Sequence, residues 1–191
     1  MQQSLPPIKR RWLTLARVWD VLAVIVIVFV IWKLLIAPRS LNQSAALPAP
    51  HLVLASLDGQ SFKLADHRGR VVFLDFYASW CEPCKLSLPL VERFARSHPQ
   101  TDVIPIDVGE PQPIAAAFAT QYKLHGVALD PNRLASNWFN VEGFPTMVVI
   151  DPKGNIRATW VGLNPAIQLN MANAVSQLGL QYTVVRPRRG G

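Results

Sequence analysis

The hydrophobic pattern divides the chain into one long apolar run near the N-terminus and a series of shorter segments after it. From Val21 to Trp32, twelve apolar residues follow one another without interruption, and the sequence LLIA continues the run beyond Lys33. The seventeen residues 21–37 are slightly fewer than a membrane-spanning helix usually needs, and the flanking turn Arg17–Asp20 makes up the difference. The pattern therefore predicts one N-terminal transmembrane helix over residues 18–37.

The shorter segments have the pattern of a folded domain. Two strand-like segments flank Asp58-Gly59, a pair of residues common in tight turns, and predict a β-hairpin over residues 52–64. Further strands are predicted at Val71–Tyr77, Val103–Val108, Val127–Leu129, Thr146–Ile150 and Ile156–Val161, and helices at Cys81–Ser97, Ile114–Lys123, 131–138 and Leu169–Leu178. Strands alternating with helices, then a final hairpin and helix, predict an α/β fold with a mixed central sheet flanked by helices.

These segments divide the chain into five predicted regions. Residues 1–17 form a basic N-terminus and residues 18–37 the membrane anchor. Residues 38–50, rich in Pro, Ser and Ala, form a linker. Residues 51–182 form the folded domain, and residues 183–191 a basic tail.

The net charge of +7 is concentrated at the two ends of the chain. Residues 1–40 carry six basic residues and one acid, and the tail from Arg186 onward adds three basic residues. The remainder has ten basic residues and eleven acids, so the folded part is nearly neutral. Because a nucleic-acid-binding domain needs a basic surface, the sequence predicts no nucleic-acid partner.

The basic residues also orient the predicted anchor. Four precede the apolar run and two lie at or beyond its far end, namely Lys9, Arg10, Arg11 and Arg17, then Lys33 and Arg39. Since basic residues favour the cytoplasmic side, we expect a single-pass protein of the cytoplasmic (inner) membrane. Its N-terminus would lie in the cytoplasm and its folded domain in the periplasm or its extracytoplasmic equivalent. The alternatives are a signal peptide cleaved near Ala45-Ala46 and a buried core helix.

The two cysteines of the chain, Cys81 and Cys84, lie in the motif WCEPC at the predicted start of a helix. The free N–H groups and the positive dipole end of that helix favour a thiolate at Cys81, and Pro83 suits the first helical turn. We therefore predict that Cys81 is the exposed attacking sulfur and that Cys84 is the buried sulfur that resolves the mixed disulfide. Trp80 would form an apolar cover beside them.

A metal site and a purely structural disulfide are the alternatives for this pair. Zinc needs about four ligands, whereas the chain offers one CxxC pair and four dispersed histidines, His51, His67, His98 and His125. A bridge across two residues closes too small a loop to restrict the unfolded chain much. The sequence thus predicts no metal site and no cofactor other than a redox-active disulfide Cys81–Cys84.

Two acidic residues are candidate modulators of the pair. Asp75 interrupts an apolar strand, where burial would raise its pKa and let it accept the proton of Cys84. The alternative is a carboxylate satisfied by hydrogen bonds at the end of the strand. Glu82 lies between the sulfurs, where its charge would disfavour the Cys81 thiolate and make the dithiol a better reductant. The alternative is a solvated side chain with little influence.

Two stretches carry a family resemblance. DFYASWCEPCKLSLP resembles the active-site segment of thioredoxin, and Gly143-Phe144-Pro145-Thr146 resembles the cis-proline loop of that superfamily. The chain is similar, more narrowly, to the membrane-anchored TlpA/ResA group of extracytoplasmic thiol-disulfide oxidoreductases, which shares the opening hairpin, the WCEPC motif and an inserted βα element. The resemblance covers about residues 50–180.

This resemblance implies a thioredoxin-like fold and further roles in the site. Pro145, if cis, would lie against Cys81, and Phe144 and Pro145 would help bind an extended client segment. Two features depart from the family pattern. Many TlpA/ResA relatives have a neutral residue at the position of Asp75, and the buried lysine that partners this carboxylate in thioredoxin has no counterpart here.

The expected function follows from the cysteine pair and the resemblance together. We expect reduction of client proteins that carry cysteine pairs, such as apocytochromes c during cytochrome c biogenesis or copper-site proteins. Because the compartment is oxidising, the protein would need a membrane electron donor, and the resemblance suggests one of the DsbD/CcdA kind. The alternatives are oxidation or isomerisation of secreted proteins, and a Cu(I)-binding module.

Overall fold

The structure is a computed structural model that describes residues 9–33, 41 and 47–185 of the 191-residue chain. It separates the chain into two compact units, Met1–Ala37 and Pro38–Gly191.

The first unit contains helix α1 (Lys9–Ile31). The described side chains of this unit, those of residues 17–33, are exposed. Within the described part of the chain, no helix combines the length and the apolar character needed to span a membrane. The predicted anchor reaches residues 34–37, which lie outside the described residues, so the anchor stays a prediction.

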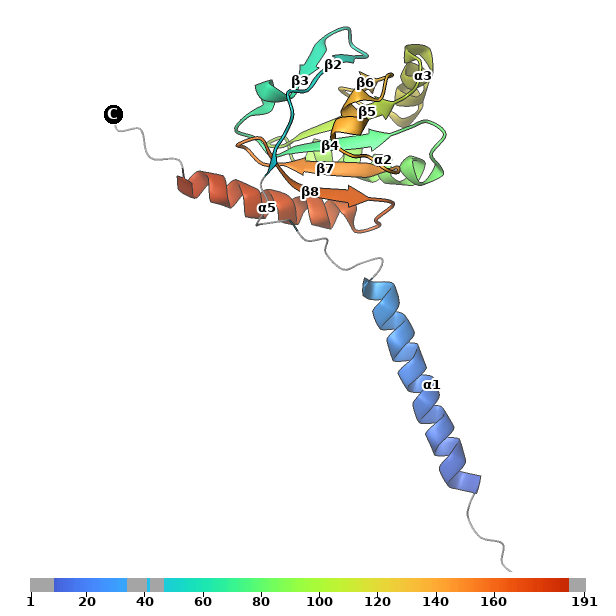
Figure 1. Ribbon diagram of the computed structural model, residues 1–191. Helices are drawn as coiled ribbons and strands as arrows, with labels where there is room; N and C mark the ends of the chain where they lie inside the picture. Colours follow the sequence, from blue (N-terminus) through green and yellow to red (C-terminus); the bar gives the residue numbers. More distant parts are fainter. Residues whose placement is uncertain (1–8, 34–40, 42–46, 186–191) are drawn as a thin grey trace, which may run out of the picture. The chain divides into compact units, whose positions relative to one another are not determined.

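The second unit is built on one sheet of eight strands (Figure 1). In spatial order, the strands are β1 (Leu47–Pro48), β8 (Asn155–Val161), β7 (Thr146–Ile150), β4 (Val72–Tyr77), β5 (Asp102–Val108), β6 (Ala128–Asp130), β2 (Val53–Ser56) and β3 (Ser61–Lys63). The pairs β4–β5 and β5–β6 are parallel, whereas all other neighbours are antiparallel. The predicted mixed sheet and N-terminal hairpin are therefore confirmed.

Strand β1 is an addition that the sequence did not predict. Leu47 and Pro48 pair with Ile156 and Asn155 of β8, although they lie in the stretch expected to be a linker. The strand is too short to show an alternating pattern, and its proline is tolerated because β1 forms the edge of the sheet.

Helices follow the predicted order with shifted ends. They are α2 (Glu82–Ser97), α3 (Gln112–Tyr122), α4 (Leu134–Trp138) and α5 (Ile167–Val185), with a short 3₁₀ turn at Leu64–His67. Helix α5 begins before and ends after its predicted bounds.

Two apolar clusters lie on opposite faces of the sheet, because successive residues of β4 point to opposite sides. Phe73 faces α2 and α5, in a cluster with Val71, Val91, Phe94, Met147, Val149, Ala158, Trp160, Ile167, Met171, Ala174 and Leu178. Val72, Leu74 and Phe76 face α4 and the N-terminal hairpin, in a cluster with Leu52, Leu54, Phe62, Leu64, Ala135 and Phe139.

A third apolar cluster surrounds the cysteine pair. It consists of Tyr77, Cys81, Cys84, Leu88, Phe118, Ala119, Leu124 and Val127, from β4, α2, α3 and the segment that follows α3. Because β4, β5 and β6 run parallel, this cluster lies at their shared carboxyl end, where α/β folds commonly place their sites.

Candidate active site

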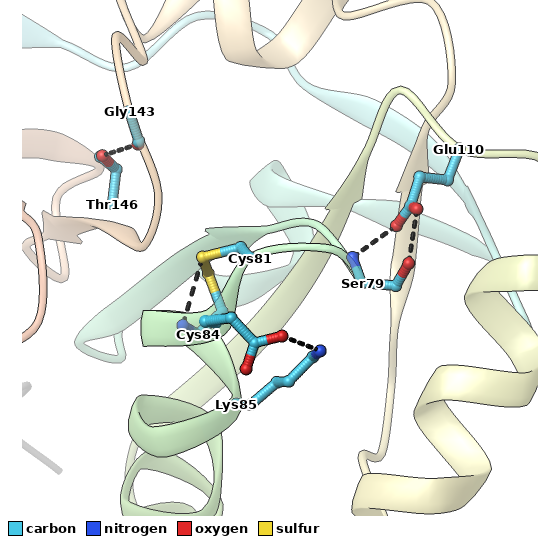
Figure 2. Close-up of a disulfide and its surroundings, with 8 residues drawn as sticks. Ser79, Cys81, Cys84, Lys85, Glu110, Gly143 and Thr146 are labelled. Atoms are coloured by element: carbon cyan, nitrogen blue, oxygen red, sulfur yellow. Dashed lines mark hydrogen bonds and ion pairs between the residues drawn. A yellow bond between two sulfur atoms is a disulfide. The ribbon is translucent and has the colours of Figure 1, made fainter.

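Cys81 and Cys84 form a disulfide at the N-terminus of α2 (Figure 2), with Cα atoms 5.3 Å apart. Cys81 is the N-cap residue, and the backbone N–H of Cys84 donates to its Sγ at 3.2 Å. Pro83 lies in the first helical turn, where a missing N–H costs nothing. After reduction, the same N–H and the helix dipole would stabilise a Cys81 thiolate.

The expected exposure of Cys81 is wrong for this disulfide form. The exposed fraction is 4% for Cys81 and 0% for Cys84. The sequence could not show this, because the segments that surround Cys81 come from separate parts of the chain. Trp80 next to it lies edge-on to the ring of Phe144, with centroids 5.7 Å apart. Cys81 nevertheless lines an open pocket, and Cys84 does not.

The Phe144–Pro145 peptide is cis, as the resemblance implies. Two carbonyls of this loop are occupied, since that of Pro145 accepts from the N–H of Gly162 at 2.8 Å and that of Gly143 from the hydroxyl of Thr146 at 2.6 Å (Figure 2). Among the described residues, the backbone groups of Phe144 have no hydrogen-bond partner. The loop therefore offers Phe144, and not the carbonyl of Pro145, to an extended segment.

An open pocket of about 440 Å³ lies beside Cys81. Its lining combines the active-site motif with the cis-proline loop and one arginine, namely Trp80, Cys81, Glu82, Pro83, Arg133, Val141, Glu142, Gly143 and Phe144. The size and the open shape suit a short stretch of client chain. The sequence predicted Phe144 at this place but missed Arg133 and Glu142.

Asp75 is buried in β4, with an exposed fraction of 1%. It lies between Phe73 and Tyr77 on the sheet face that α2 covers. Its Oδ2 has no hydrogen-bond partner within the described part of the chain, contrary to the alternative of a fully satisfied carboxylate. Burial, and secondarily the negative charge of Glu92, raises the pKa of Asp75 to about 7.

Glu92 is a second buried carboxylate, and it was not predicted from the sequence. It belongs to α2, and its carboxylate lies 3.4 Å from Nδ1 of His125 and 3.8 Å from the guanidinium of Arg96. Its position on the buried side of an amphipathic helix was a usable signal, but its proximity to Asp75 follows only from the packing of α2 on β4.

The loop that leads to the cysteines is fastened to the loop after β5. The N–H and the hydroxyl of Ser79 donate to the carboxylate of Glu110 at 2.7 Å and 2.6 Å (Figure 2). Burial and the negative charge of Glu110 raise the pKa of nearby Asp107 to about 7. No sequence pattern indicated this contact between residues 31 positions apart.

Glu82 forms an ion pair with Lys85, which was not predicted from the sequence. Its carboxylate is 2.5 Å from Nζ of Lys85, and its side chain is 79% exposed. The lysine charge offsets part of the negative charge that Glu82 brings to the sulfurs, and water screens both groups.

Two of the four histidines that were considered as metal ligands make other contacts. His67 lies 2.9 Å from the carboxylate of Asp102, and His98 stacks on Phe94. Within the described ranges, no three His, Cys, Asp or Glu side chains are grouped in a way that could hold a metal ion.

Comparison with known proteins gives consistent matches. Residues 46–159 match the model of the AhpC/TSA family. The thiol-disulfide oxidoreductase ResA of Geobacillus kaustophilus is 31% identical over 117 residues, which cover 60% of this chain and 67% of the relative.

Two solved structures of similar fold share more than a quarter of their residues with this chain over the aligned part. The thiol:disulfide interchange protein DsbE of Chlorobium tepidum is 29% identical with a TM-score of 0.65, over 70% of this chain and 96% of that one. The exposed lipoprotein thioredoxin Etrx1 of Streptococcus pneumoniae is 27% identical with a TM-score of 0.58, over 68% of this chain and 100% of that one.

Proposed function

Since the chain belongs to the AhpC/TSA family and is a thiol-disulfide oxidoreductase of the ResA/DsbE kind, we propose that it reduces client disulfides outside the cytoplasmic membrane. The observation that carries this proposal is the Cys81–Cys84 pair, placed at the start of α2 with Cys81 on an open pocket. We favour reduction because Glu82 is the charged residue between the two cysteines. The part of its negative charge that Lys85 does not offset opposes the Cys81 thiolate.

The first chemical step is attack by the reduced protein. The Cys81 thiolate attacks one sulfur of the client disulfide, which breaks the client S–S bond and forms a mixed disulfide. The second client cysteine leaves as a thiolate and takes a proton from water. Phe144 supports this step, since its free backbone groups can pair with the client segment beside Cys81.

The second step releases the client. Cys84 loses its proton to Asp75 and attacks the Cys81 sulfur, which breaks the bond between Cys81 and the client and forms the Cys81–Cys84 disulfide. The first client cysteine leaves as a thiolate and takes a proton from water. Asp75 suits this role because its pKa of about 7 lets it both accept and return a proton near neutral pH. The client thus gains two electrons and two protons, and the disulfide seen here is the product state.

The place of action and the source of electrons are further parts of the proposal. The apolar run at 18–37 would anchor the protein with the folded unit on the outer side. A membrane electron donor of the DsbD/CcdA kind would then reduce the Cys81–Cys84 disulfide again. An outside location is supported by the description of the pneumococcal relative as an exposed lipoprotein.

Trapping the mixed disulfide tests the proposal. In full-length Cys84→Ser, the resolving sulfur is absent, so client proteins should accumulate as covalent adducts on Cys81 that dithiothreitol releases. Adducts would be identified by mass spectrometry after purification under acid quench. We expect proteins with cysteine pairs, and a set dominated by haem-binding CxxCH proteins would assign the client class to apocytochromes c.

The control is the Cys81→Ser variant, which keeps one cysteine and lacks the attacking sulfur. It should capture far fewer partners than Cys84→Ser. Equal capture by both variants, or a native protein whose cysteines are disulfide-bonded at steady state in growing cells, would contradict a reductase acting through Cys81.

A further inference from the structure

The pocket beside Cys81 carries three charged side chains, and two of them already have partners. Glu82 pairs with Lys85 at 2.5 Å, and the carboxylate of Glu142 accepts from the amide of Asn140 at 3.0 Å. Arg133 is the third. Among the described residues, its guanidinium has no ion-pair or hydrogen-bond partner, and its side chain is exposed.

The backbone of Arg133 is firmly held. Its N–H donates to the carbonyl of Asp130 at 3.1 Å, and its carbonyl accepts from the hydroxyl of Ser136 at 3.2 Å. The buried carboxylate of Asp130 also accepts from the N–H groups of Ala135 and Ser136, which fixes the start of α4. Arg133 thus projects from a turn whose backbone is held, so a ligand must order the side chain but not the backbone.

The loop after β5 leaves room for the arginine side chain. Gly109 has a φ of +77°, and a Cβ there would lie 3.0 Å from Nε of Arg133. The guanidinium therefore lies over a loop that has no side chain at this point. The next residue, Glu110, holds Ser79 of the active-site loop, so Arg133 and the cysteines are positioned by the same connection.

We propose that Arg133 selects clients by binding a carboxylate near the client cysteine that Cys81 attacks. A guanidinium offers several donors in a plane and binds a carboxylate through two parallel hydrogen bonds. The pocket is open enough for one residue on either side of the client cysteine to reach it. This inference rests on the proposed function and specifies its substrate class as disulfides flanked by Asp or Glu.

Model peptides with an internal disulfide test the selection. In one set of three peptides, the residue that precedes the attacked cysteine is Glu, Gln or Lys. In a second set of three, the residue that follows this cysteine is varied in the same way. The rate constant for reduction by the full-length dithiol protein is measured at low and at high salt. For one of the two sets, the native protein should reduce the Glu peptide about two- to fivefold faster than the Gln peptide. This ratio corresponds to the interaction free energy of one exposed ion pair.

Variants of Arg133 test whether this residue causes the preference for the Glu peptide. In Arg133→Gln the Glu and Gln peptides should be reduced at equal rates, whereas Arg133→Lys should keep part of the preference. Arg93→Gln removes the same charge from an exposed position of α2 outside the pocket and should keep all of it. High salt should weaken the native preference, because the pair is exposed.

The outcomes separate this inference from the proposed function. A native protein that reduces all peptides at equal rates, that prefers Lys, or whose preference survives Arg133→Gln would overturn the role of Arg133 while leaving the reductase intact. If the native protein reduces none of the peptides, the proposed function is contradicted, and the client selection with it.

Discussion

At the scale of single residues, two acidic side chains, Asp75 of β4 and Glu92 of α2, are buried from water. Asp75 is buried on the sheet face that α2 covers, and Glu92 lies close enough to repel its charged form. A carboxyl with a pKa of about 7 stays protonated over much of the pH range in which a surface aspartate is ionised. The folded protein therefore holds a proton on Asp75 at a pH at which the unfolded chain has released it, and this lowers the stability near and above neutral pH.

Replacing Asp75 with Asn should make the stability less dependent on pH. The folded pKa of Asp75 is about 7 and its ordinary value is 3.8, so the folded protein holds a proton that the unfolded chain releases between these values. The free energy of unfolding of the native protein should therefore fall as pH rises from 4 to 8. The difference in the free energy of unfolding between Asp75→Asn and the native protein should shift in favour of Asp75→Asn by up to about 4 kcal/mol over this range. Urea unfolding at each pH measures it.

Two further variants test the cause of this shift. Glu92→Gln removes the charge that repels ionised Asp75, so it should lower the pKa of Asp75. The fall in the free energy of unfolding should then end at a lower pH. Asp66→Asn, at an exposed position, should follow the native curve. Asp107 also titrates near 7 but is present in all four proteins, so its effect cancels. Parallel curves for native and Asp75→Asn would show that Asp75 has an ordinary pKa.

At the scale of elements, the active-site loop is held from two sides. Helix α2 begins directly after Cys81, and the Ser79–Glu110 contact joins the end of β4 to the loop after β5 (Figure 2). These two strands are parallel neighbours, so their ends meet at one edge of the sheet. The sulfurs are thereby fixed to the sheet as well as to the helix.

Ser79→Ala should weaken this connection. The variant loses the hydrogen bond from the Ser79 hydroxyl to Glu110, so one partly buried carboxylate oxygen of Glu110 loses this donor. We therefore expect the free energy of unfolding to fall by about 1–3 kcal/mol. Urea unfolding of the oxidised protein measures it. Ser176→Ala, at an exposed position of α5, should stay within about 0.5 kcal/mol of native. A Ser79→Ala protein as stable as this control would show that the contact holds nothing in place.

At the scale of the whole molecule, the charge and the apolar residues are separated along the chain. The first 40 residues carry a net +5 and the apolar run, whereas the long middle part is close to neutral. The structure divides the chain at a similar place, between Ala37 and Pro38. This separation is consistent with the proposed tethering, in which the predicted anchor and the folded unit would meet different surroundings.

The predicted anchor gives a simple fractionation result. The full chain should stay with membranes after an alkaline wash and should keep its N-terminal residues by mass spectrometry of the purified protein. Added protease should remove the folded unit from spheroplasts without lysis. Release by the wash would contradict the anchor, and a mature protein that begins near Ala45-Ala46 would show instead that the run is a cleaved signal.

The sequence by itself determined the parts of this protein that depend on short stretches. The strand and helix order follows from hydrophobic periodicity, and the cysteine pair and cis-proline loop are identified by WCEPC and by Gly143 to Thr146, each contained in a few consecutive residues. Asp75 was identifiable because one charge inside an apolar strand is costly wherever that strand lies.

Only the tertiary structure decided which distant residues share the site. Glu110, Glu92 and Arg133 lie on separate elements, and their neighbours depend on strand order and on how α2 packs. The same holds for the burial of Cys81 and for β1, which exists only because β8 offers it an edge. Contacts between residues far apart in sequence leave no local pattern, so no single stretch of the chain could have shown them.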